Sequence, residues 1–239
     1  MKDGSMTDVH SHLIWGVDDG SRSLDISLEM IRMSVAQGVG RIVCTPHYSE
    51  QFHGYNKAQA LEKFEQLKAA VGDECELYLG QEIFGSEGML QKLADGELLT
   101  MGGQNYVLIE FYPWESVYNI QRMVREVEML SYHPILAHIE RYEALSDEKK
   151  VMELMEQGAY MQINCSDICG HLFDRTAAYC KRLLESGLVH FLGTDMHDTK
   201  HRAPKVKAAL KWMNSNLDDE YVAEICSLNA DKMLRGERI

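Results

Sequence analysis

The chain has 239 residues, of which 45% are hydrophobic, and its formal net charge is −13 at pH 7. A chain of this length can bury the core of one domain, so we expect a single domain over residues 1–239, with a loose lead-in over residues 1–6. The acidic balance argues against a nucleic-acid partner, because phosphate backbones bind clustered Lys and Arg, which we do not expect here. With no long apolar stretch and no secretory signal, we expect a cytoplasmic protein without a membrane span.

Short apolar, β-branched runs alternate with helical patterns along the whole chain. The runs predict seven strands, over residues 8–14, 41–46, 76–82, 106–111, 135–139, 160–164 and 189–194. Between them, apolar residues recur at helical spacing, over residues 24–35, 61–71, 120–130, 151–155, 177–184 and 206–213. Gly38, Gly158 and Gly187 stand where helices are expected to end. Repeated βα units of roughly 30 residues imply a parallel sheet, in a closed or nearly closed barrel.

Two short motifs near opposite ends of the chain have the spacing of metal ligands on a strand. They are His10-Ser11-His12 and Asp195-Met196-His197. Residues two apart on a strand point to the same face, so each pair can converge on one ion. Between them, four further candidates stand at or near the ends of predicted strands: His47, Glu82, Glu110 and His138. Since the C-terminal ends of barrel strands meet on one side, these motifs predict a shared metal site.

The candidate ligands combine imidazole and carboxylate groups without a thiolate, which suits Mn, Zn or Fe. Nine candidates are too many for one ion, so we expect two or three ions sharing a bridging carboxylate: His10, His12, Asp19, His47, Glu82, Glu110, His138, Asp195 and His197. Three divalent ions (+6) against four carboxylates (−4) leave a balance of +2, which would attract a phosphate monoester. Arg141 and Arg202 follow His138 and His197 closely, where guanidinium groups would hold phosphate oxygens.

The order of motifs resembles that of the polymerase-and-histidinol-phosphatase (PHP) superfamily. The matching segments are DVHSHLIWGVDDGS, IVCTPHYS, GQEI, LIEF, AHIERY, QIN and GTDMH, which together span nearly the whole chain. More narrowly, VDDG and HIERY resemble the bacterial manganese-dependent tyrosine-protein phosphatases, which act on tyrosine autokinases controlling capsule or exopolysaccharide synthesis. The resemblance implies an α/β fold, a distorted (β/α)7 TIM-like barrel of the PHP type. It also implies three divalent ions, with manganese the first choice and iron or zinc as alternatives.

The resemblance further implies a role for each candidate residue. One ion would be held by His10, His12, Glu82 and Asp195, a second by Glu82 as a bridge with Glu110 and His138, and a third by Asp19, His47 and His197. Arg141 and Arg202 match family positions that grip phosphate and stabilise charge in the reaction. The chain departs from the family at Ala203, where relatives often have Pro, and at Tyr48, where they often have His.

The activity expected from these residues is hydrolysis of phosphotyrosine in a protein or peptide by a metal-bridging hydroxide. The nearest alternative is a PHP phosphoesterase acting on a small phosphomonoester such as histidinol phosphate, which would keep every ligand. Two more distant candidates are a metal-stabilised barrel that binds a kinase tail without cleaving it, and an amidohydrolase acting on C–N bonds.

Cysteines and aromatic residues supply three further patterns. The thiol-phosphatase signature Cys-x5-Arg occurs from Cys169 to Arg175, but the bulky and acidic residues inside it predict a chance match. Six irregularly spaced cysteines predict mostly buried thiols rather than a disulfide framework. Four aromatic residues predict either a wall for a phenyl ring or loops packed on the rim: Trp15, Tyr48, Phe52 and Tyr55.

Overall fold

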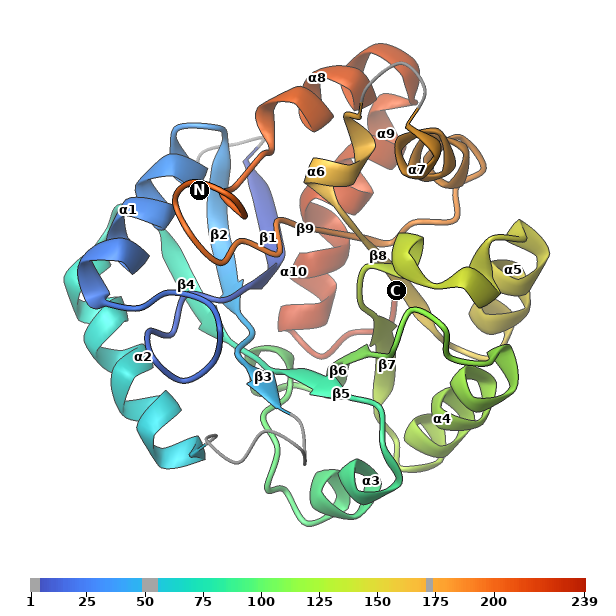
Figure 1. Ribbon diagram of the computed structural model, residues 1–239, viewed down its shortest axis with the longest axis horizontal. Coiled ribbons are helices and arrows are strands. Elements are labelled where there is room, and N and C mark those ends of the chain that lie inside the picture. The colour runs from blue at the N-terminus through green and yellow to red at the C-terminus, as the bar shows by residue number, and fades with distance from the viewer. Residues whose placement is uncertain (1–4, 49–55, 171–173) are drawn as a thin grey trace.

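In the computed structural model, parallel strands form the centre of the molecule and helices surround them (Figure 1). The structure describes residues 5–48, 56–170 and 174–239. One sheet has the order β1-β2-β4, formed by Met6–Ser11, Val39–Cys44 and Glu76–Leu79. The other has the order β3-β5-β6-β7-β8-β9, formed by His47–Tyr48, Glu82–Phe84, Tyr106–Glu110, His133–Leu136, Tyr160–Asn164 and Phe191–Gly193. Every pairing within these sheets is parallel, as the repeated βα units predicted.

The two sheets meet where the end of β1 passes the segment after β9. Ser11 forms an isolated parallel bridge with Met196. The backbone N–H of Asp195 donates to the carbonyl of His10 (2.8 Å), and that of His12 donates to the carbonyl of Met196 (3.0 Å). The two sequence motifs, about 185 residues apart, therefore lie side by side.

The strand predictions need three corrections. The run predicted over residues 76–82 forms two strands, because β4 pairs with β2 whereas β5 pairs with β3 and β6. The short strand β3 follows β2 after two residues and was not predicted. β1 begins at Met6, which is buried, so the predicted loose lead-in over residues 1–6 does not include Met6. Residues 1–4 of that lead-in lie outside the described part.

Helices form at each of the six predicted places. They are α1 (Leu24–Val35), α2 (Lys57–Val71), α4 (Val117–Met129), α5 (Glu148–Glu156), α7 (Arg175–Glu185) and α8 (Lys207–Asn216). Gly38, Gly158 and Gly187 all have positive φ angles just after helices, as predicted for helix stops. Four helices were not predicted: α3 (Glu87–Ala94), α6 (Cys165–Ile168), α9 (Asp219–Ala223) and α10 (Asn229–Leu234). Three 3-10 turns (Met101–Gly103, Ile139–Arg141, Glu143–Leu145) and a π-helical segment (Glu224–Leu228) complete the elements of the described residues.

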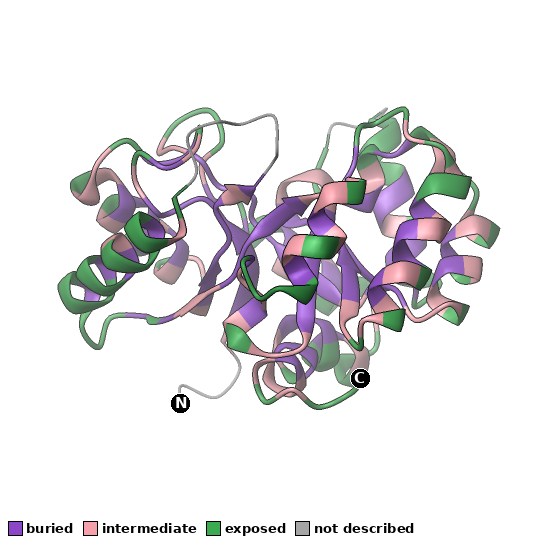
Figure 2. Ribbon diagram, turned by 90° about the horizontal axis from the view of Figure 1, so that it is seen from below, coloured by how far each residue is buried: buried purple, intermediate pink, exposed green. Residues whose placement is uncertain are grey.

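The core lies between the strands and the inner faces of the helices, while outer helix faces are exposed (Figure 2). A second apolar cluster joins strand residues such as Val9, Tyr106 and Ile135 to Ala230 and Met233 of α10. Leu61, predicted on the apolar face of α2, is 41% exposed, because the buried face of α2 is formed by Ala60, Phe64, Leu67 and Val71 instead. Among the described residues, none of the helices has the length and apolar character that crossing a bilayer requires. All six cysteines are unpaired, and only Cys169 is exposed.

Candidate metal centre

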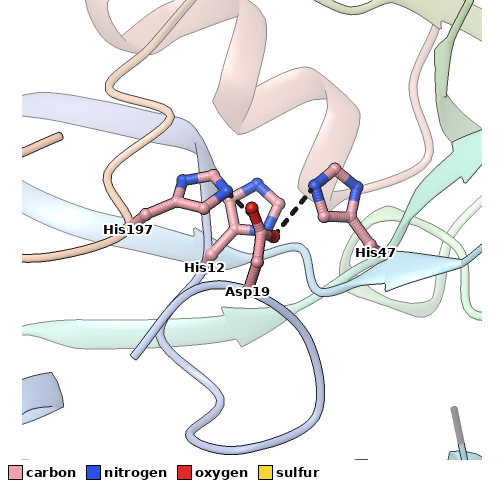
Figure 3. A group of neighbouring side chains, drawn as sticks. All are labelled: His12, Asp19, His47 and His197. Carbon is pink, nitrogen blue, oxygen red and sulfur yellow. Dashed lines mark ion pairs between the residues drawn. The ribbon is translucent and has the colours of Figure 1, made fainter. Parts of the chain in front are cut away.

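Eight of the nine predicted ligands form three overlapping groups of potential ligand atoms. Within each group, the ligand atoms lie within 4.8 Å of one another. The groups are His12, Asp19, His47 and His197 (Figure 3); His10, His12 and Asp195; and His47, Glu82 and Glu110. His138 lies beside the third group, with Nε2 2.9 Å from Glu82 Oε1 and 3.8 Å from Glu110 Oε2. The structure thus brings all nine side chains to one place.

Glu82 stands at the centre of this arrangement and is fully buried. Its Oε2 atom lies 3.0 Å from His10 Nε2, 3.2 Å from His12 Nε2 and 3.0 Å from His47 Nδ1. Nevertheless, no described atom is placed to form a hydrogen bond with it. The Nε2 atoms of His10 and His12 also face each other at 3.2 Å. A buried carboxylate oxygen surrounded by converging ring nitrogens fits a bound cation better than it fits a hydrogen-bond network.

His47 is placed between two of the groups. Its Nδ1 lies 3.1 Å from Glu110 Oε1 as well as 3.0 Å from Glu82 Oε2, and its Nε2 lies 3.5 Å from Asp19 Oδ1. The resemblance assigned His47 to the ion shared with Asp19 and His197. In this geometry its two nitrogens face two different groups.

The pKa values show that, without metal, attraction between protonated histidines and ionised carboxylates holds the predicted ligands together. Burial would lower the pKa of His10, but the negative charges of Glu82 and Asp195 outweigh it and raise that pKa. Burial would raise the pKa of Glu82, but the positive charges of His10 and His47 hold it well below its usual range. The same balance lowers the pKa of Asp195. Imidazolium protons therefore compete with metal for this site, and binding of cations would release them.

Arg141 and Arg202 both reach Asp195. Arg141 Nη2 lies 2.7 Å from Asp195 Oδ2, and Arg202 Nη2 lies 2.8 Å from Oδ1. Arg202 Nη1 is also 3.5 Å from Asp19 Oδ2. The two arginine side chains are 39% and 41% exposed, and both line a cavity of about 290 Å³. Two guanidinium groups at the open side of a buried carboxylate can hold the oxygens of an incoming anion.

Two site residues have strained backbones. His138 and Asp195 have φ angles of 34° and 52°, in the left-handed region that non-glycine residues avoid. Ser131 is the one other non-glycine residue of the described part with a positive φ angle. Such strain costs free energy and is typical of functional sites.

The family model for capsular polysaccharide synthesis proteins CpsB/CapC matches residues 6–235. This chain belongs to the CpsB/CapC family. It is 34% identical over 251 aligned residues to a tyrosine-protein phosphatase CpsB of Streptococcus agalactiae, covering 98% of this chain and 100% of the relative. It is 30% identical to the tyrosine-protein phosphatase YwqE of Bacillus subtilis, covering 98% of this chain and 93% of the relative.

Solved structures agree with the family. A crystal structure from a study of YwqE from Bacillus subtilis and CpsB from Streptococcus pneumoniae, described as unique metal-dependent tyrosine phosphatases, superposes with a TM-score of 0.90. It is 28% identical and covers 98% of this chain and 96% of that chain. The phosphotriesterase homology protein of Escherichia coli, with phosphate in its active site, has a TM-score of 0.62 at 11% identity. It covers 97% of this chain and 99% of that chain. At that identity the likeness shows the fold alone.

Within this CpsB/CapC family site, several residues that orient the ligands were not predicted. Asp18 Oδ2 accepts hydrogen bonds from His12 Nδ1 (2.9 Å) and from the backbone N–H of His47 (3.0 Å). Gln162 Oε1 lies 3.1 Å from His10 Nδ1 and accepts from the backbone N–H of His138 (2.8 Å). Neither follows the strand-end pattern of the ligands, although Asp18 adjoins Asp19 and Gln162 is in the QIN segment.

Two buried carboxyl groups also lie behind the ligands. Asp8 accepts from the Thr194 hydroxyl (2.6 Å) and backbone N–H (2.8 Å), and from the His10 backbone N–H (3.2 Å). Burial raises the pKa of Asp8 to about 6, although these hydrogen bonds lower it. Glu140 accepts from the backbone N–H of Asn164 (3.0 Å), and burial raises its pKa well above the usual range. Asn164 Nδ2 donates to Asp195 Oδ2 (3.2 Å), which ties this layer to the ligands.

Two of the four aromatic residues predicted to form a wall or to pack on the rim lie in the described part of the chain. Tyr48 is buried, Trp15 is partly buried with the Lys63 ammonium 5.6 Å from its ring centre, and Phe52 and Tyr55 lie outside the described residues. Two further aromatic residues, Tyr112 and Trp114, come shortly after the predicted ligand Glu110. Their rings stack at 5.1 Å and 3°, and Trp114 is 70% exposed.

The Cys169-x5-Arg175 signature gains no support. Burial raises the pKa of the Cys169 thiol, whereas a thiolate nucleophile needs a lowered pKa. Arg175 begins α7, and residues 171–173 between them lie outside the described part.

Proposed function

We propose that this CpsB/CapC family protein is a metal-dependent phosphatase that hydrolyses phosphotyrosine in protein. The observation that carries the proposal is the buried Glu82 carboxylate among three imidazoles, beside an Asp195 that both Arg141 and Arg202 reach. The names of the family relatives point to the same activity.

We propose three divalent ions, manganese first and iron or zinc as alternatives. His10, His12 and Asp195 would hold one, Glu82 and Glu110 with His138 a second, and Asp19 with His197 a third. Glu82 and His47 face more than one group, which is the position of a bridging or shared ligand. When bound, such ions polarise phosphate oxygens and lower the pKa of a bound water, so that hydroxide forms near neutral pH.

The chain's own side chains would complete the chemistry. Arg141 and Arg202 would bind phosphate oxygens in place of Asp195, because guanidinium groups form charge-assisted bidentate hydrogen bonds with phosphate. They would then stabilise the negative charge that develops on those oxygens. The leaving group is a phenolate with a pKa of about 10, so a dedicated general acid is not required. Asp18 and Gln162 would keep the imidazole rings oriented.

We further propose a distorted (β/α)7 barrel of the PHP type forming one domain over residues 1–239. The count of seven follows if β2 with β3, and β4 with β5, each represent one barrel strand. A tyrosine autokinase that controls capsule or exopolysaccharide synthesis is the proposed substrate, in the cytoplasm. The description of the family, capsular polysaccharide synthesis, supports the link to capsule synthesis.

The test compares substrates on the manganese-loaded protein. Phosphotyrosine peptide should be hydrolysed with a much higher kcat/KM than histidinol phosphate, the small-molecule alternative. Preference for histidinol phosphate would reverse the assignment. Phosphopeptide binding without phosphate release would indicate a binding module, and hydrolysis of cyclic amides alone would indicate an amidohydrolase.

A further inference from the structure

One stretch of this acidic chain carries a concentrated positive charge. Residues 199–217 contain no Asp or Glu, and they hold five basic side chains in a chain whose net charge is −13: Lys200, Arg202, Lys205, Lys207 and Lys211. The same stretch also contains His201, whose imidazole can carry a positive charge. The expectation that basic residues are not clustered in this sequence is therefore wrong for this stretch.

Two adjoining grooves lie along this stretch, and the first belongs to the metal centre. It is the cavity of about 290 Å³ at Arg141, Asp195 and Arg202, which His201 and Lys205 also line. The second has a volume of about 460 Å³ and lies between α6 and α8. Its lining includes Ser166, Lys205, Lys207 and Lys211, with Gln37 and Cys169. Because Ser166 and Lys205 line both grooves, they form one continuous path, which we call the basic track.

The basic track has a fixed frame. Gln37 Oε1 accepts from the backbone N–H groups of Val206 (2.9 Å) and Lys207 (3.2 Å), and its Nε2 donates to the Pro204 carbonyl (2.8 Å). These bonds attach the start of α8 to the turn that follows α1, and Lys207 and Lys211 lie on the side of α8 that lines the groove. A preformed groove loses less entropy when it binds a ligand.

The charges along the track are available for a partner. Lys205, Lys207 and Lys211 are exposed and form no ion pair with any residue of the described chain. The acidic residues lining the two grooves are Asp167 and Asp195. Asp195 already forms ion pairs with both Arg141 and Arg202. Three uncompensated lysines in an acidic protein favour an anionic partner at this surface.

We propose that the basic track binds an acidic segment of the protein substrate adjoining its phosphotyrosine. This inference rests on the proposed phosphatase function. A phosphate held by Arg141 and Arg202 would lie in the first groove, so the neighbouring substrate residues pass Lys205 into the second. Lys207 and Lys211 are one helical turn apart, about 6 Å along α8. Alternate side chains of an extended peptide are about 7 Å apart, so acidic residues at i and i+2 match them.

A peptide suits the track better than a membrane surface does. The track is concave and leads into the groove of the metal centre, whereas an anionic bilayer presents a flat surface that would contact protruding side chains. A peptide can also fill both grooves while its phosphotyrosine occupies the centre.

The experiment uses the full chain loaded with manganese and two phosphotyrosine peptides. One carries glutamates at alternate positions beside the phosphotyrosine, and the other carries glutamines at the same positions. The test variant is Lys207→Gln with Lys211→Gln. The matched control is Lys68→Gln with Lys149→Gln, which removes two exposed positive charges from α2 and α5.

We expect the test variant to raise KM for the acidic peptide about tenfold, while its kinetics with the glutamine peptide and with p-nitrophenyl phosphate stay unchanged. The control should behave as wild type, and 0.5 M salt should remove the wild-type preference, since screening weakens exposed charge pairs. Equal kinetics of wild type with both peptides, or an equal loss in the control, would overturn the inference.

Two further arms separate the track from the catalytic activity and from membrane binding. If no phosphotyrosine substrate is hydrolysed, the proposed function fails. The track is then judged by fluorescence-anisotropy binding of the acidic peptide, whose loss in the test variant alone would support it and whose persistence would overturn it. Loss of sedimentation with phosphatidylserine vesicles in the test variant, with peptide kinetics unchanged, would assign the track to a membrane and overturn the peptide proposal.

Discussion

Asp18 holds His12 in a single orientation. Its Oδ2 atom accepts from His12 Nδ1 at 2.9 Å, so the Nε2 atom of the same ring faces Glu82 and Asp195. The Asp18 Oδ1 atom accepts from the backbone N–H of Gly20 at 2.9 Å, which fixes the carboxylate itself. A carboxylate behind a ligating imidazole sets its tautomer and increases its basicity.

Replacing Asp18 by Asn should therefore weaken metal binding without removing a ligand. We expect 10- to 100-fold weaker manganese affinity, a typical effect of losing a carboxylate behind a histidine ligand. Titration of the metal-free protein with Mn²⁺, followed by electron paramagnetic resonance of the free ion, measures this directly. Asp73→Asn, an exposed residue of the α2–β4 loop, is the matched control. Equal affinities in the two variants would show that Asp18 has no positioning role.

Removal of metal should abolish activity, whereas thiol modification should have little effect. EDTA is expected to inactivate the protein and Mn²⁺ to restore it, because the proposed chemistry depends on metal held by histidines and carboxylates. Iodoacetamide should leave most activity intact, since five cysteines are buried and burial raises the pKa of the exposed Cys169. Inactivation by iodoacetamide combined with resistance to EDTA would favour a cysteine mechanism instead.

Loss of either of two proposed ligands should stop turnover while the fold remains. We expect Asp195→Ala or His138→Ala to lower kcat by at least about a thousandfold, because each removes a proposed ligand of the ions that would stabilise the reacting groups. Circular dichroism and thermal unfolding should stay close to wild type, since both residues serve the site rather than the apolar core. Wild-type rates in either variant would contradict the assignment.

The residues that gather at the candidate site could be predicted from sequence because they are chemically distinct residues in or near predicted strands. His10, Glu82 and Asp195 interrupt apolar patterns that otherwise predict strands, and the parallel topology brings those ends together. The carboxylates at 18 and 19 are harder to separate. Adjacent residues of a loop have no periodicity, and only the folded loop shows that Asp18 supports His12 while Asp19 faces His47 and His197.

The break between β4 and β5 and the π-helical segment could not be predicted from sequence, because neither has a clear local pattern. Between β4 and β5, Gly80 and Gln81 are both buried, so no exposed turn separates the two strands. Burial thus hides the change of strand partner. The π-helical segment at Glu224–Leu228 shifts the helical period between α9 and α10, so the apolar spacing there does not match a regular helix.

Gly193 packs directly against a predicted ligand. A Cβ atom at this position would lie 2.6 Å from His10 Cβ and 2.8 Å from Gln162 Nε2, closer than atoms can approach. We expect Gly193→Ala to displace His10, lowering stability by about 1 to 3 kcal/mol and weakening manganese binding. Gly40→Ala is the control, because its Cβ would meet Ser5 instead. Urea unfolding and metal titration should show that both variants lose stability but that Gly193→Ala alone loses metal affinity.

His190 should make the stability of the protein fall as the solution becomes acidic. Burial lowers its pKa to about 4, and its neutral Nδ1 accepts from the backbone N–H of Met161 at 3.1 Å. An unfolded histidine titrates near 6.5, so the unfolded chain binds more protons between these values. The contribution of His190 to the free energy of unfolding is therefore largest above pH 6.5 and falls as the pH drops toward 4.

His190→Asn keeps an acceptor near this position but cannot titrate. Between pH 7.5 and pH 5, the metal-free wild type should lose about 2 kcal/mol more stability than the variant. Urea unfolding at the two pH values measures this difference, and the remaining titrating groups cancel because they are common to both proteins. Parallel losses in the two proteins would mean that protonation of His190 does not oppose folding. A larger loss in the variant would mean that the buried ring is charged in the native state.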